Sequence, residues 1–359
     1  MSAINEVPNP PSDAITSVRF SPDGNSLLVS SWETTIQVYH RSDEGYKHTT
    51  SIQCDGPILD VCWGADSSTF FAAGIDHEVA KYNVNEGEES RVVMSSHTQA
   101  VNKIAYSKEH DMVISTSWDE TMHIHNPSDN VFVPIKLAAK PFASSLTADR
   151  LVVAMAERHV HVYDLTALRD LIGQAGSTEA MREPLVVEPW QQRLSNLKFM
   201  TRDIACMPDG TGFSTGSIEG RVSVEFFDPA LEKEAYAFKC HRVKTDAVDE
   251  QGEKLNEFIH PVNSIVYHPV NAGTFATGGG DGVVALWDAK TKRRIRQYPK
   301  LDASVVALDF SRDGSRLAIT MSPNFEEGKE EEEADPGLVK VFVRELTESE
   351  TKGKPAKEK

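Results

Sequence analysis

The 359-residue sequence has few of the features that mark secreted, metal-stabilised or membrane proteins. Its four cysteines, Cys54, Cys62, Cys206 and Cys240, are widely spaced and form no CxxC pair, so neither a zinc site nor a disulfide framework is predicted. No apolar run is long enough to span a bilayer, and no apolar signal region stands at the N-terminus. These absences predict a soluble intracellular protein with reduced thiols, no metal, no cofactor and no membrane contact.

Basic residues are also scarce, because 37 Lys and Arg stand against 54 Asp and Glu, which gives a formal charge of −17. Binding to nucleic acid needs a clustered positive surface that neutralises phosphates, so a dedicated nucleic-acid binder is not expected. Part of the acidic excess is local to residues 326–335, which we expect to form a solvated loop within the last repeat. The rest of the chain is acidic but has enough cations to carry a basic patch.

An internal repeat is the strongest positive signal in the sequence. An acidic residue is followed six positions later by an aromatic residue or histidine in five copies: Glu33/Tyr39, Asp76/Tyr82, Asp119/His125, Glu157/Tyr163 and Asp281/Trp287. Two further copies, Glu219/Phe226 and Asp335/Phe342, have a spacing of seven. The first three copies recur every 43 residues, and one four-stranded blade of a WD40 propeller needs roughly 40 to 45. The sequence therefore predicts an all-β, seven-bladed WD40 propeller.

The segment 14–40 shows the pattern within one copy. Alternating residues predict a strand at 15–20, the sequence Ser21-Pro22-Asp23-Gly24 predicts a tight turn, and two more strands are expected at 27–30 and 35–39. Similar Asp-Gly turns occur at 207–210 and 311–314, where these residues supply the backbone conformations that a hairpin requires.

Two insertions widen the spacing between copies four and six. A helix is expected within 166–181, and a polar, charged insertion lies at 244–258. Because a closed ring of repeats is one unit, we expect a single propeller over residues 1–344, followed by a disordered charged tail at 345–359.

Motifs for catalysis or metal binding are weak. The run Gly278-Gly279-Gly280-Asp281-Gly282 lacks the strand-to-helix context of a dinucleotide site, and there is no GxSxG or HExxH motif. The pairs His123/His125 and His159/His161 each put two histidines on one strand face, a spacing that is compatible with metal ligation. No carboxylate or cysteine repeats beside them, so histidines without metal are favoured and the protein is not expected to be an enzyme.

The residue before the acidic repeat position is apolar or small in six copies: Trp32, Ile75, Trp118, Ala156, Ile218 and Gly280. In a propeller these turns meet around one end of the central channel. We expect a ring that binds an extended peptide, with Trp32 and Trp118 as its largest contacts. Packing of the same residues between blades is the alternative interpretation.

A second candidate surface is cationic. Two residues after the acidic position, Arg221 is the only permanent cation among the copies, and Lys239 and Arg242 lie in the outer-strand segment of the same blade. Arginine and lysine together suit a phosphate or carboxylate ligand, since a phosphothreonine carries close to two negative charges. An ordinary surface ion-pair cluster is the alternative that the residues alone leave open.

Several motifs carry a family resemblance. The segments Ser30-Ser31-Trp32 and Ser117-Trp118-Asp119, with 217–222 and 236–242, resemble the mitotic-checkpoint WD40 proteins of the Bub3 family and their paralogues, the messenger-RNA export factors of the nuclear pore. The segment 224–229 and the acidic charge are more similar to the checkpoint members. The resemblance covers nearly the whole propeller, but the insertion at 244–258 departs from shorter relatives.

The resemblance implies a non-catalytic adaptor with two peptide ligands. Arg221 and Lys239 would hold the phosphothreonine of Met-Glu-Leu-Thr repeats in a kinetochore scaffold, and Trp32 would contact the apolar residue of that repeat. Arg202 and Trp118 would bind the GLEBS motif of checkpoint kinases and their relatives. The implied location is the nucleus and the kinetochore, which is compatible with a cytoplasmic pool. The alternative is an export factor that binds nucleic acid and a nucleoporin GLEBS motif.

Overall fold

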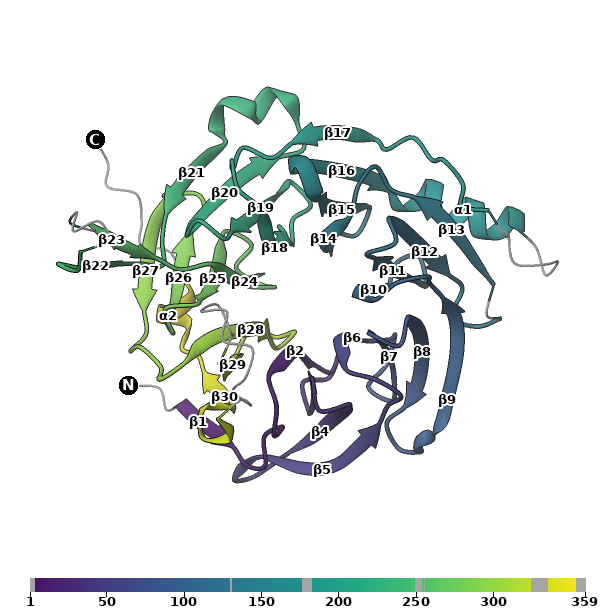
Figure 1. Cartoon of the computed structure of the whole chain (residues 1–359), viewed down its shortest axis with the longest axis horizontal. Helices are drawn as coiled ribbons and strands as arrows, with labels where there is room; N and C mark the ends of the chain where they lie inside the picture. Colours follow the sequence, from purple (N-terminus) through teal and green to yellow (C-terminus); the bar gives the residue numbers. More distant parts are fainter. Residues whose placement is uncertain are drawn as a thin grey trace.

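A computed structural model describes residues 4–352 except 130, 176–182, 249–253, 255 and 324–334. The described chain forms seven four-stranded antiparallel sheets, arranged as blades around a central channel (Figure 1). Each blade begins at the channel and ends with its fourth strand at the outer edge. The predicted all-β, seven-bladed propeller is confirmed.

The strands of the first four blades, from the channel outwards, are as follows. Blade 1 contains β2 (Ile15–Phe20), β3 (Ser26–Ser31), β4 (Thr35–Ser42) and β5 (Gly45–Gln53). Blade 2 contains β6 (Ile58–Trp63), β7 (Thr69–Gly74), β8 (Glu78–Asn83) and β9 (Gly87–Ser96). Blade 3 contains β10 (Val101–Ser107), β11 (Met112–Ser117), β12 (Thr121–His125) and β13 (Phe132–Lys136). Blade 4 contains β14 (Pro141–Leu146), β15 (Arg150–Met155), β16 (His159–Asp164) and β17 (Gln191–Leu194).

The remaining blades follow the same order. Blade 5 contains β18 (Thr201–Cys206), β19 (Gly212–Ser217), β20 (Arg221–Phe226) and β21 (Tyr236–Lys239). Blade 6 contains β24 (Val262–Tyr267), β25 (Thr274–Gly279), β26 (Val284–Asp288) and β27 (Arg293–Gln297). Blade 7 contains β28 (Ser304–Phe310), β29 (Arg316–Ser322), β30 (Lys340–Glu345) and β1 (Ile4–Val7).

The ring is closed by the N-terminal strand. β1 pairs antiparallel with β30, with Ile4 opposite Arg344 and Val7 opposite Val341, so the two ends of the chain complete one blade (Figure 1). The repeat pattern did not predict this pairing, because β1 lies outside every copy of the acidic-aromatic repeat.

In blades 6 and 3 the structure explains the acidic-aromatic repeat as a hydrogen-bonded network within the blade. In blade 6, the Nε1 of Trp287 donates to Thr277 Oγ1 (2.9 Å), which lies 2.9 Å from His241 Nε2, and His241 Nδ1 lies 2.8 Å from Asp281. The acidic residue thus fixes the loop that precedes the blade, and the aromatic residue completes the network six positions later.

Blade 3 repeats the arrangement with a histidine in place of the tryptophan. His97 lies between Asp119 and Ser115, and Ser115 Oγ lies 3.2 Å from His125 Nε2. His123 stacks on His97 with ring centroids 3.5 Å apart. The pair His123/His125 is therefore part of a buried blade network. Within the described residues no group of three or more His, Cys, Asp or Glu is placed to hold a metal ion.

Predicted turns and strands in the first copy agree with the structure. The strand expected at 15–20 is β2, and those expected at 27–30 and 35–39 lie within β3 and β4. The Asp-Gly turns close with Gly24 N donating to Ser21 O (2.8 Å) and Gly314 N donating to Ser311 O (2.7 Å). Both glycines have φ of +71°, a left-handed conformation that glycine adopts more readily than residues with a Cβ atom.

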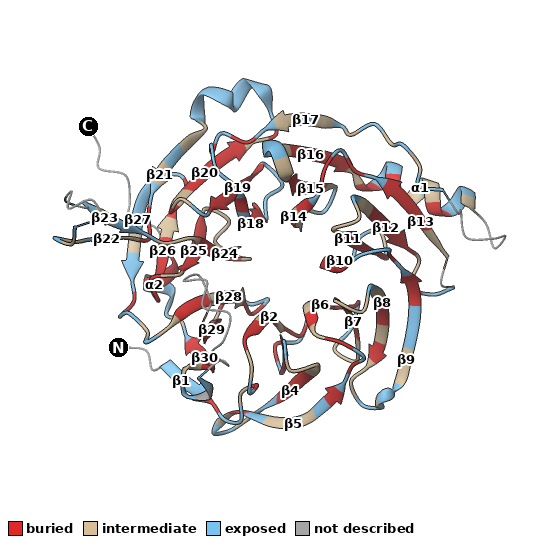
Figure 2. Cartoon of the chain, in the orientation of Figure 1, coloured by how far each residue is buried: buried red, intermediate tan, exposed pale blue. Residues whose placement is uncertain are grey.

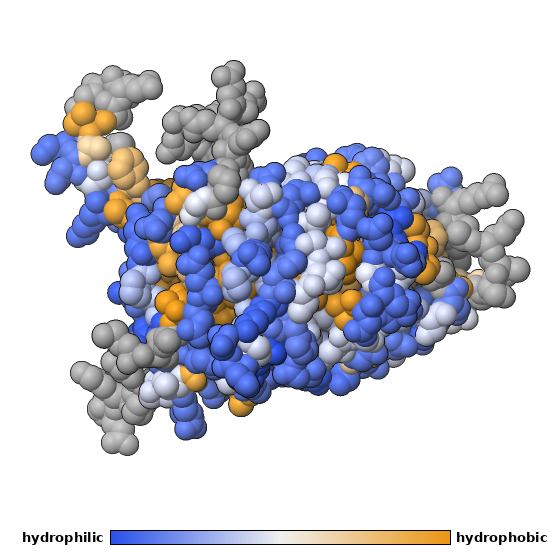
Figure 3. Space-filling model, turned by 90° about the horizontal axis from the view of Figure 1, so that it is seen from below, coloured by the Kyte–Doolittle hydropathy of each residue, from blue (hydrophilic) through white to orange (hydrophobic). Residues whose placement is uncertain are grey.

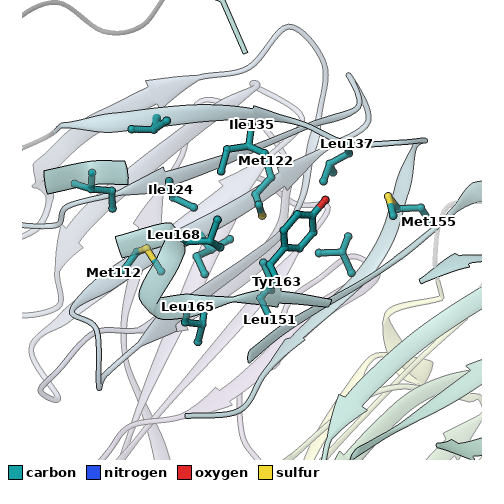
Figure 4. Close-up of a cluster of buried hydrophobic side chains, with 14 of the residues drawn as sticks. Met112, Met122, Ile124, Ile135, Leu137, Leu151, Met155, Tyr163, Leu165 and Leu168 are labelled. Atoms are coloured by element: carbon teal, nitrogen blue, oxygen red, sulfur yellow. The ribbon is translucent and has the colours of Figure 1, made fainter. Parts of the chain in front are cut away.

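The hydrophobic core lies between neighbouring blades. Buried residues dominate the inner and middle strands, while most outer strands have more exposed and half-buried positions (Figure 2). Between blades 3 and 4, Met122, Ile135 and Tyr163 pack with Leu165 and Leu168 of helix α1 (Leu165–Ala175) (Figure 4). Each blade therefore depends on its neighbours for burial, which makes the ring one cooperative unit.

The insertions differ in structure. The expected helix is present as α1, and the rest of its predicted range, 176–181, lies outside the described residues. After α1, Leu185 forms a parallel bridge to Ile135 and so covers the outer edge of blade 3. The second insertion contributes a short ribbon, β22 (Arg242–Lys244) and β23 (Glu257–Ile259), in which Val243 and Phe258 are exposed. Figure 3 shows a projection with exposed hydrophobic residues on the side where Figure 1 places this ribbon.

The C-terminal boundary differs from the prediction. Disorder was expected from residue 345, but β30 extends to Glu345 and helix α2 (Glu348–Thr351) packs against the ring. Glu350 is buried and lies 3.0 Å from Arg344 and 3.1 Å from Arg296, so two cations compensate its burial. Residues 353–359 and most of the acidic run 326–335 lie outside the described residues. No described helix is long and apolar enough to cross a membrane.

Candidate functional site

Two turns of the same construction display the tryptophans Trp32 and Trp118. In each turn the tryptophan N–H donates to a carbonyl of the preceding loop, Ala14 or Ala100, at 3.0 Å. The acidic residue that follows also bonds back to that loop, since Glu33 accepts from Ser12 N (2.6 Å) and Asp119 accepts from Thr98 N (2.8 Å). The hydrogen bonds use the backbone and the carboxylate and not the indole rings, of which that of Trp32 is exposed and that of Trp118 is half-buried.

Both tryptophans line one cavity of about 380 Å³ at the end of the central channel. Arg202, at the start of β18, lines the same cavity, together with Met200 and Lys103. Trp32 is 45% exposed, which is a large fraction for a tryptophan, since this residue type is mostly buried. An apolar surface with a few cations at its margin is suited to an extended peptide that carries both aromatic or aliphatic and acidic side chains.

The side chains around this cavity are partly held in place by neighbouring blades. Arg202 Nε donates to Asn263 Oδ1 of blade 6 at 3.3 Å, and Asn263 Nδ2 donates to Ser304 Oγ and Val305 O of blade 7. Lys140 Nζ lies 5.8 Å from the ring centroid of Trp118. These contacts connect three blades and restrict the guanidinium and the indole before any ligand binds.

A second site lies on blade 5, where Arg221 and Lys239 occupy directly opposite positions on β20 and β21. Residues opposite each other in an antiparallel pair have Cβ atoms roughly 4.5 to 5.5 Å apart and point to the same face, and like charges in such positions repel. Lys239 is exposed, and the Arg221 side chain is 36% exposed. Two cations are thus held together at the surface of an acidic protein.

The structure separates Arg242 from this pair. Its guanidinium donates to Glu219 O (2.8 Å) and to Glu257 Oε2 (3.0 Å), and only 12% of its side chain is exposed. Arg242 therefore joins the turn before β20 to the β22–β23 ribbon. Among the described residues, the one carboxylate in ion-pair contact with Arg221 is that of Glu219, whose Oε2 lies 3.4 Å from Arg221 Nε, so the terminal nitrogens of the guanidinium keep donors for an anion.

Gly220 makes the turn before Arg221 possible. Its φ is +61°, and a Cβ atom at this position would lie 2.7 Å from Cys240 O and 3.0 Å from His260 O. The backbone of this turn is therefore packed against the loop after β21. This close approach brings the start of β20 next to the end of β21 and so sets Arg221 beside Lys239.

The inner strands line the channel with charged and polar residues. Asp60 lies 3.0 Å from Arg19 and 4.0 Å from Lys103, Asp309 accepts from Phe20 N, and Asp203 accepts from Ile265 N. Burial raises the pKa of Asp203, and it raises the pKa of Asp309 to about 6. These carboxylates join the inner strand of one blade to that of the next, which is a structural role.

Comparison with known proteins agrees with this architecture. The family model described as WD domain, G-beta repeat matches residues 5–40, 88–126 and 252–288. A mitotic checkpoint protein BUB3.1 from Arabidopsis thaliana is 39% identical over 362 residues, which cover 99% of this chain and 96% of that protein. A mitotic checkpoint protein bub3 from Dictyostelium discoideum is 31% identical over 96% of this chain and 95% of its own length.

The chain belongs to the Bub3 family of mitotic checkpoint proteins. Export factors also match over nearly the full length but with lower identity. The Poly(A)+ RNA export protein of Schizosaccharomyces pombe is 26% identical over 98% of this chain and 93% of its own length.

Within this family member, the predicted site residues fall into two groups. Trp32, Trp118 and Arg202 line one cavity, and Arg221 and Lys239 form the second site. The assignment of Trp32 to the phosphopeptide stays a prediction, and it requires a particular path of the peptide. Trp32 lies on blade 1 and Arg221 on blade 5, across the channel in Figure 1, so one peptide would have to cross the end of the channel to contact both.

Sequence reasoning missed several residues at the same surfaces. Phe199 and Met200 precede Arg202 and are 54% and 42% exposed, and Met200 lines the cavity with the tryptophans. Glu219, which contacts Arg221, was considered only as a weak copy of the repeat. The consecutive apolar residues Phe199 and Met200 could have indicated this surface, because the turn before an inner strand is usually polar.

Proposed function

We propose that this protein is a non-catalytic adaptor of the spindle assembly checkpoint that joins a phosphorylated kinetochore scaffold to checkpoint kinases. Arg221 and Lys239 bind the phosphothreonine of Met-Glu-Leu-Thr repeats, and the cavity with Trp118 and Arg202 binds GLEBS motifs. The expected location is the nucleus and the kinetochore.

The observation that carries this proposal is the like-charge pair on β20 and β21. Repulsion between directly opposite cations costs stability, and among the described residues the carboxylate paired with Arg221 is that of Glu219, which lies 3.4 Å from Nε. A dianionic phosphate relieves the repulsion and accepts charge-assisted hydrogen bonds from both side chains. A neutral threonine at the same position does neither.

Fluorescence polarisation with labelled repeat peptides tests the proposal. The protein should bind the phosphothreonine peptide and bind the threonine peptide at least about tenfold more weakly, which corresponds to one charge-assisted hydrogen bond or more. Equal affinity for the two peptides would exclude phosphate recognition.

A second candidate function is messenger-RNA export, which rests on the similarity to the Poly(A)+ RNA export protein. The net charge of −17 and the lower identity favour the checkpoint role. An RNA-binding titration at several salt concentrations separates the two roles, since an export factor that contacts RNA directly should show tight binding that weakens steeply with salt.

A further inference from the structure

The outer edge of blade 6 carries a basic cluster that neither peptide site uses. Between residues 289 and 300 the chain has six cations and no acidic residue, in a protein of net charge −17. The six residues, here called the blade-6 basic edge, are Lys290, Lys292, Arg293, Arg294, Arg296 and Lys300. They lie on strand β27 and on the turns at its two ends.

All six side chains belong to exposed residues, and few are neutralised. Lys292 lies 4.0 Å from Glu234, and Arg296 lies 3.1 Å from Glu350. Among the described residues, Lys290, Arg293, Arg294 and Lys300 have no carboxylate within ion-pair distance. Several like charges in one short segment repel each other, so the bare surface is electrostatically unfavourable and an anion would relieve it.

Protection of an exposed strand edge does not account for this cluster. Proteins often place a lysine or another charge on an edge strand to prevent unwanted pairing. The other outer strands carry much less positive charge: β5, β13, β17 and β21 each have one Lys or Arg, β9 has one Arg beside two Glu, and β1 has none. Three arginines on the five residues of β27 exceed what edge protection requires here.

We propose that the blade-6 basic edge is a docking surface for an acidic, extended peptide segment of a partner protein. In the described structure β27 pairs only with β26, so its outer side presents backbone donors and acceptors to an added strand. The side chains of β27 alternate between its two faces. Glutamate or aspartate side chains of the added strand would therefore meet cations on both faces.

A single-stranded nucleic acid fits this surface less well than a peptide. Bases bind such proteins by stacking on exposed aromatic rings. The two rings beside the edge are already covered by its own cations, since Lys292 Nζ lies 4.7 Å from the Tyr236 ring and Arg294 lies 6.0 Å from the Trp287 ring. Nucleotides also cannot form the backbone ladder that an edge strand offers.

The test uses the full chain and a labelled peptide of about ten alternating glutamate and threonine residues, long enough to pair along β27. The wild-type protein should bind this peptide, and binding should weaken as salt rises. Replacing Lys290, Arg293 and Arg294 together by glutamine should weaken binding by at least about tenfold. Lys47, Lys108 and Lys136 replaced together by glutamine form the matched control, with the same change in net charge at other exposed positions, and should change binding by less than about twofold.

Further arms separate the remaining outcomes. The charge-retaining double variant Arg293→Lys/Arg294→Lys should keep most of the affinity, because positive charge at these positions is what the peptide binds. A peptide with N-methyl groups at alternate residues should bind more weakly, because it cannot pair along the edge. Equal loss in the control variant, undiminished binding of the methylated peptide, or tighter binding of a uridine oligonucleotide at this edge would each overturn the proposal. The melting temperature of the glutamine variant should match that of the wild type, which excludes loss by unfolding and does not depend on the proposed function.

Discussion

At the residue scale, the contacts of each cation within the protein determine whether it can bind a ligand. The sequence alone does not distinguish three neighbouring cations of blade 5 as possible ligand contacts: Arg221, Lys239 and Arg242. The structure divides them, because Arg242 is used by Glu257 and a backbone carbonyl while Arg221 and Lys239 remain at the surface. The number of hydrogen bonds already satisfied within the protein determines which cation can bind a ligand.

Arg221→Ala and Lys239→Ala should each weaken binding of the phosphorylated repeat peptide by about 1 to 3 kcal/mol, the range for charge-assisted hydrogen bonds. Melting temperatures should stay close to that of the wild type, because neither residue is buried. Isothermal titration calorimetry measures the affinity, and Lys47→Ala serves as an exposed control. If both variants bound the peptide as tightly as the wild type, the phosphate would have to be held elsewhere.

The buried histidines of blade 3 should make the protein sensitive to acid. Burial, together with neighbouring His97, lowers the pKa of His123 to about 2 and that of His125 to about 3. In the unfolded chain both would take up a proton near pH 6.5. Below pH 6.5 the unfolded state therefore binds more protons than the folded state. As the pH falls from 6.5, the free energy of unfolding should decrease by up to about 1.4 kcal/mol per pH unit for each histidine.

Urea denaturation between pH 7 and pH 5 measures this slope. His125→Trp should reduce it, since the indole can donate to Ser115 as Trp287 donates to Thr277 in blade 6 and has no group that titrates. His77→Asn is the control, at an exposed turn position whose φ of +70° asparagine also adopts. An unchanged slope in the His125→Trp variant would show that other groups cause the acid sensitivity.

At the element scale, the turns between the second and third strands have two functions that the sequence combines in one motif. In blades 1 and 3 the acidic residues Glu33 and Asp119 bond back to the preceding loop, and the tryptophans before them can contact a ligand. The two tryptophans therefore sit on turns that the blade itself makes rigid. A rigid aromatic side chain loses little entropy when a peptide binds.

Trp118→Ala should weaken binding of a GLEBS-type peptide by roughly 2 kcal/mol or more and should affect the phosphopeptide less. Arg202→Ala should likewise weaken GLEBS binding more than it weakens phosphopeptide binding. Trp190→Ala is the matched control, an exposed tryptophan on the outer side of blade 4 that lies beside Arg150. A fall in melting temperature with unchanged GLEBS affinity would assign Trp118 to the core of its blade.

The strand β1 should contribute strongly to stability although it is short and lies at the end of the chain. Val7 is 2% exposed and packs with the core between blades 7 and 1, whereas Ile4 on the same strand is 43% exposed. Val7→Ala should lower the free energy of unfolding by about 1 to 3 kcal/mol. Ile4→Ala should change it by less than about 0.5 kcal/mol. Equal, small effects in thermal denaturation would mean that the ring closes without β1.

At the scale of the whole molecule, negative charge is distributed so that the sites remain cationic. Seven of the 54 acidic residues lie in the run 326–335, of which only Asp335 is described. Cations gather at Arg221 and Lys239 and along the blade-6 basic edge. Because exposed charges more than about 10 Å apart are largely screened at physiological salt, these local clusters can attract anions in spite of the net charge.

Replacing residues 326–335 by a short Gly/Ser linker should leave the melting temperature nearly unchanged, because a run of like charges buries little surface and repels itself. Phosphopeptide affinity should be unchanged or slightly higher, more visibly at low salt. Differential scanning calorimetry and the peptide titration measure both effects. A large loss of stability would show that this run packs against the ring.

The sequence by itself determined the number of blades and the first three strands of blade 1. These follow from local chemistry: the repeat network needs an acidic residue and an aromatic or histidine at fixed spacing, and tight turns need Asp and Gly. The tertiary structure alone decided that β1 closes blade 7, that Trp32 shares a cavity with Arg202, and that residues 345–352 are ordered. Each of these depends on a contact between segments far apart in the chain. No local pattern records such a contact, because its free energy comes from the partner surface that the closed ring provides.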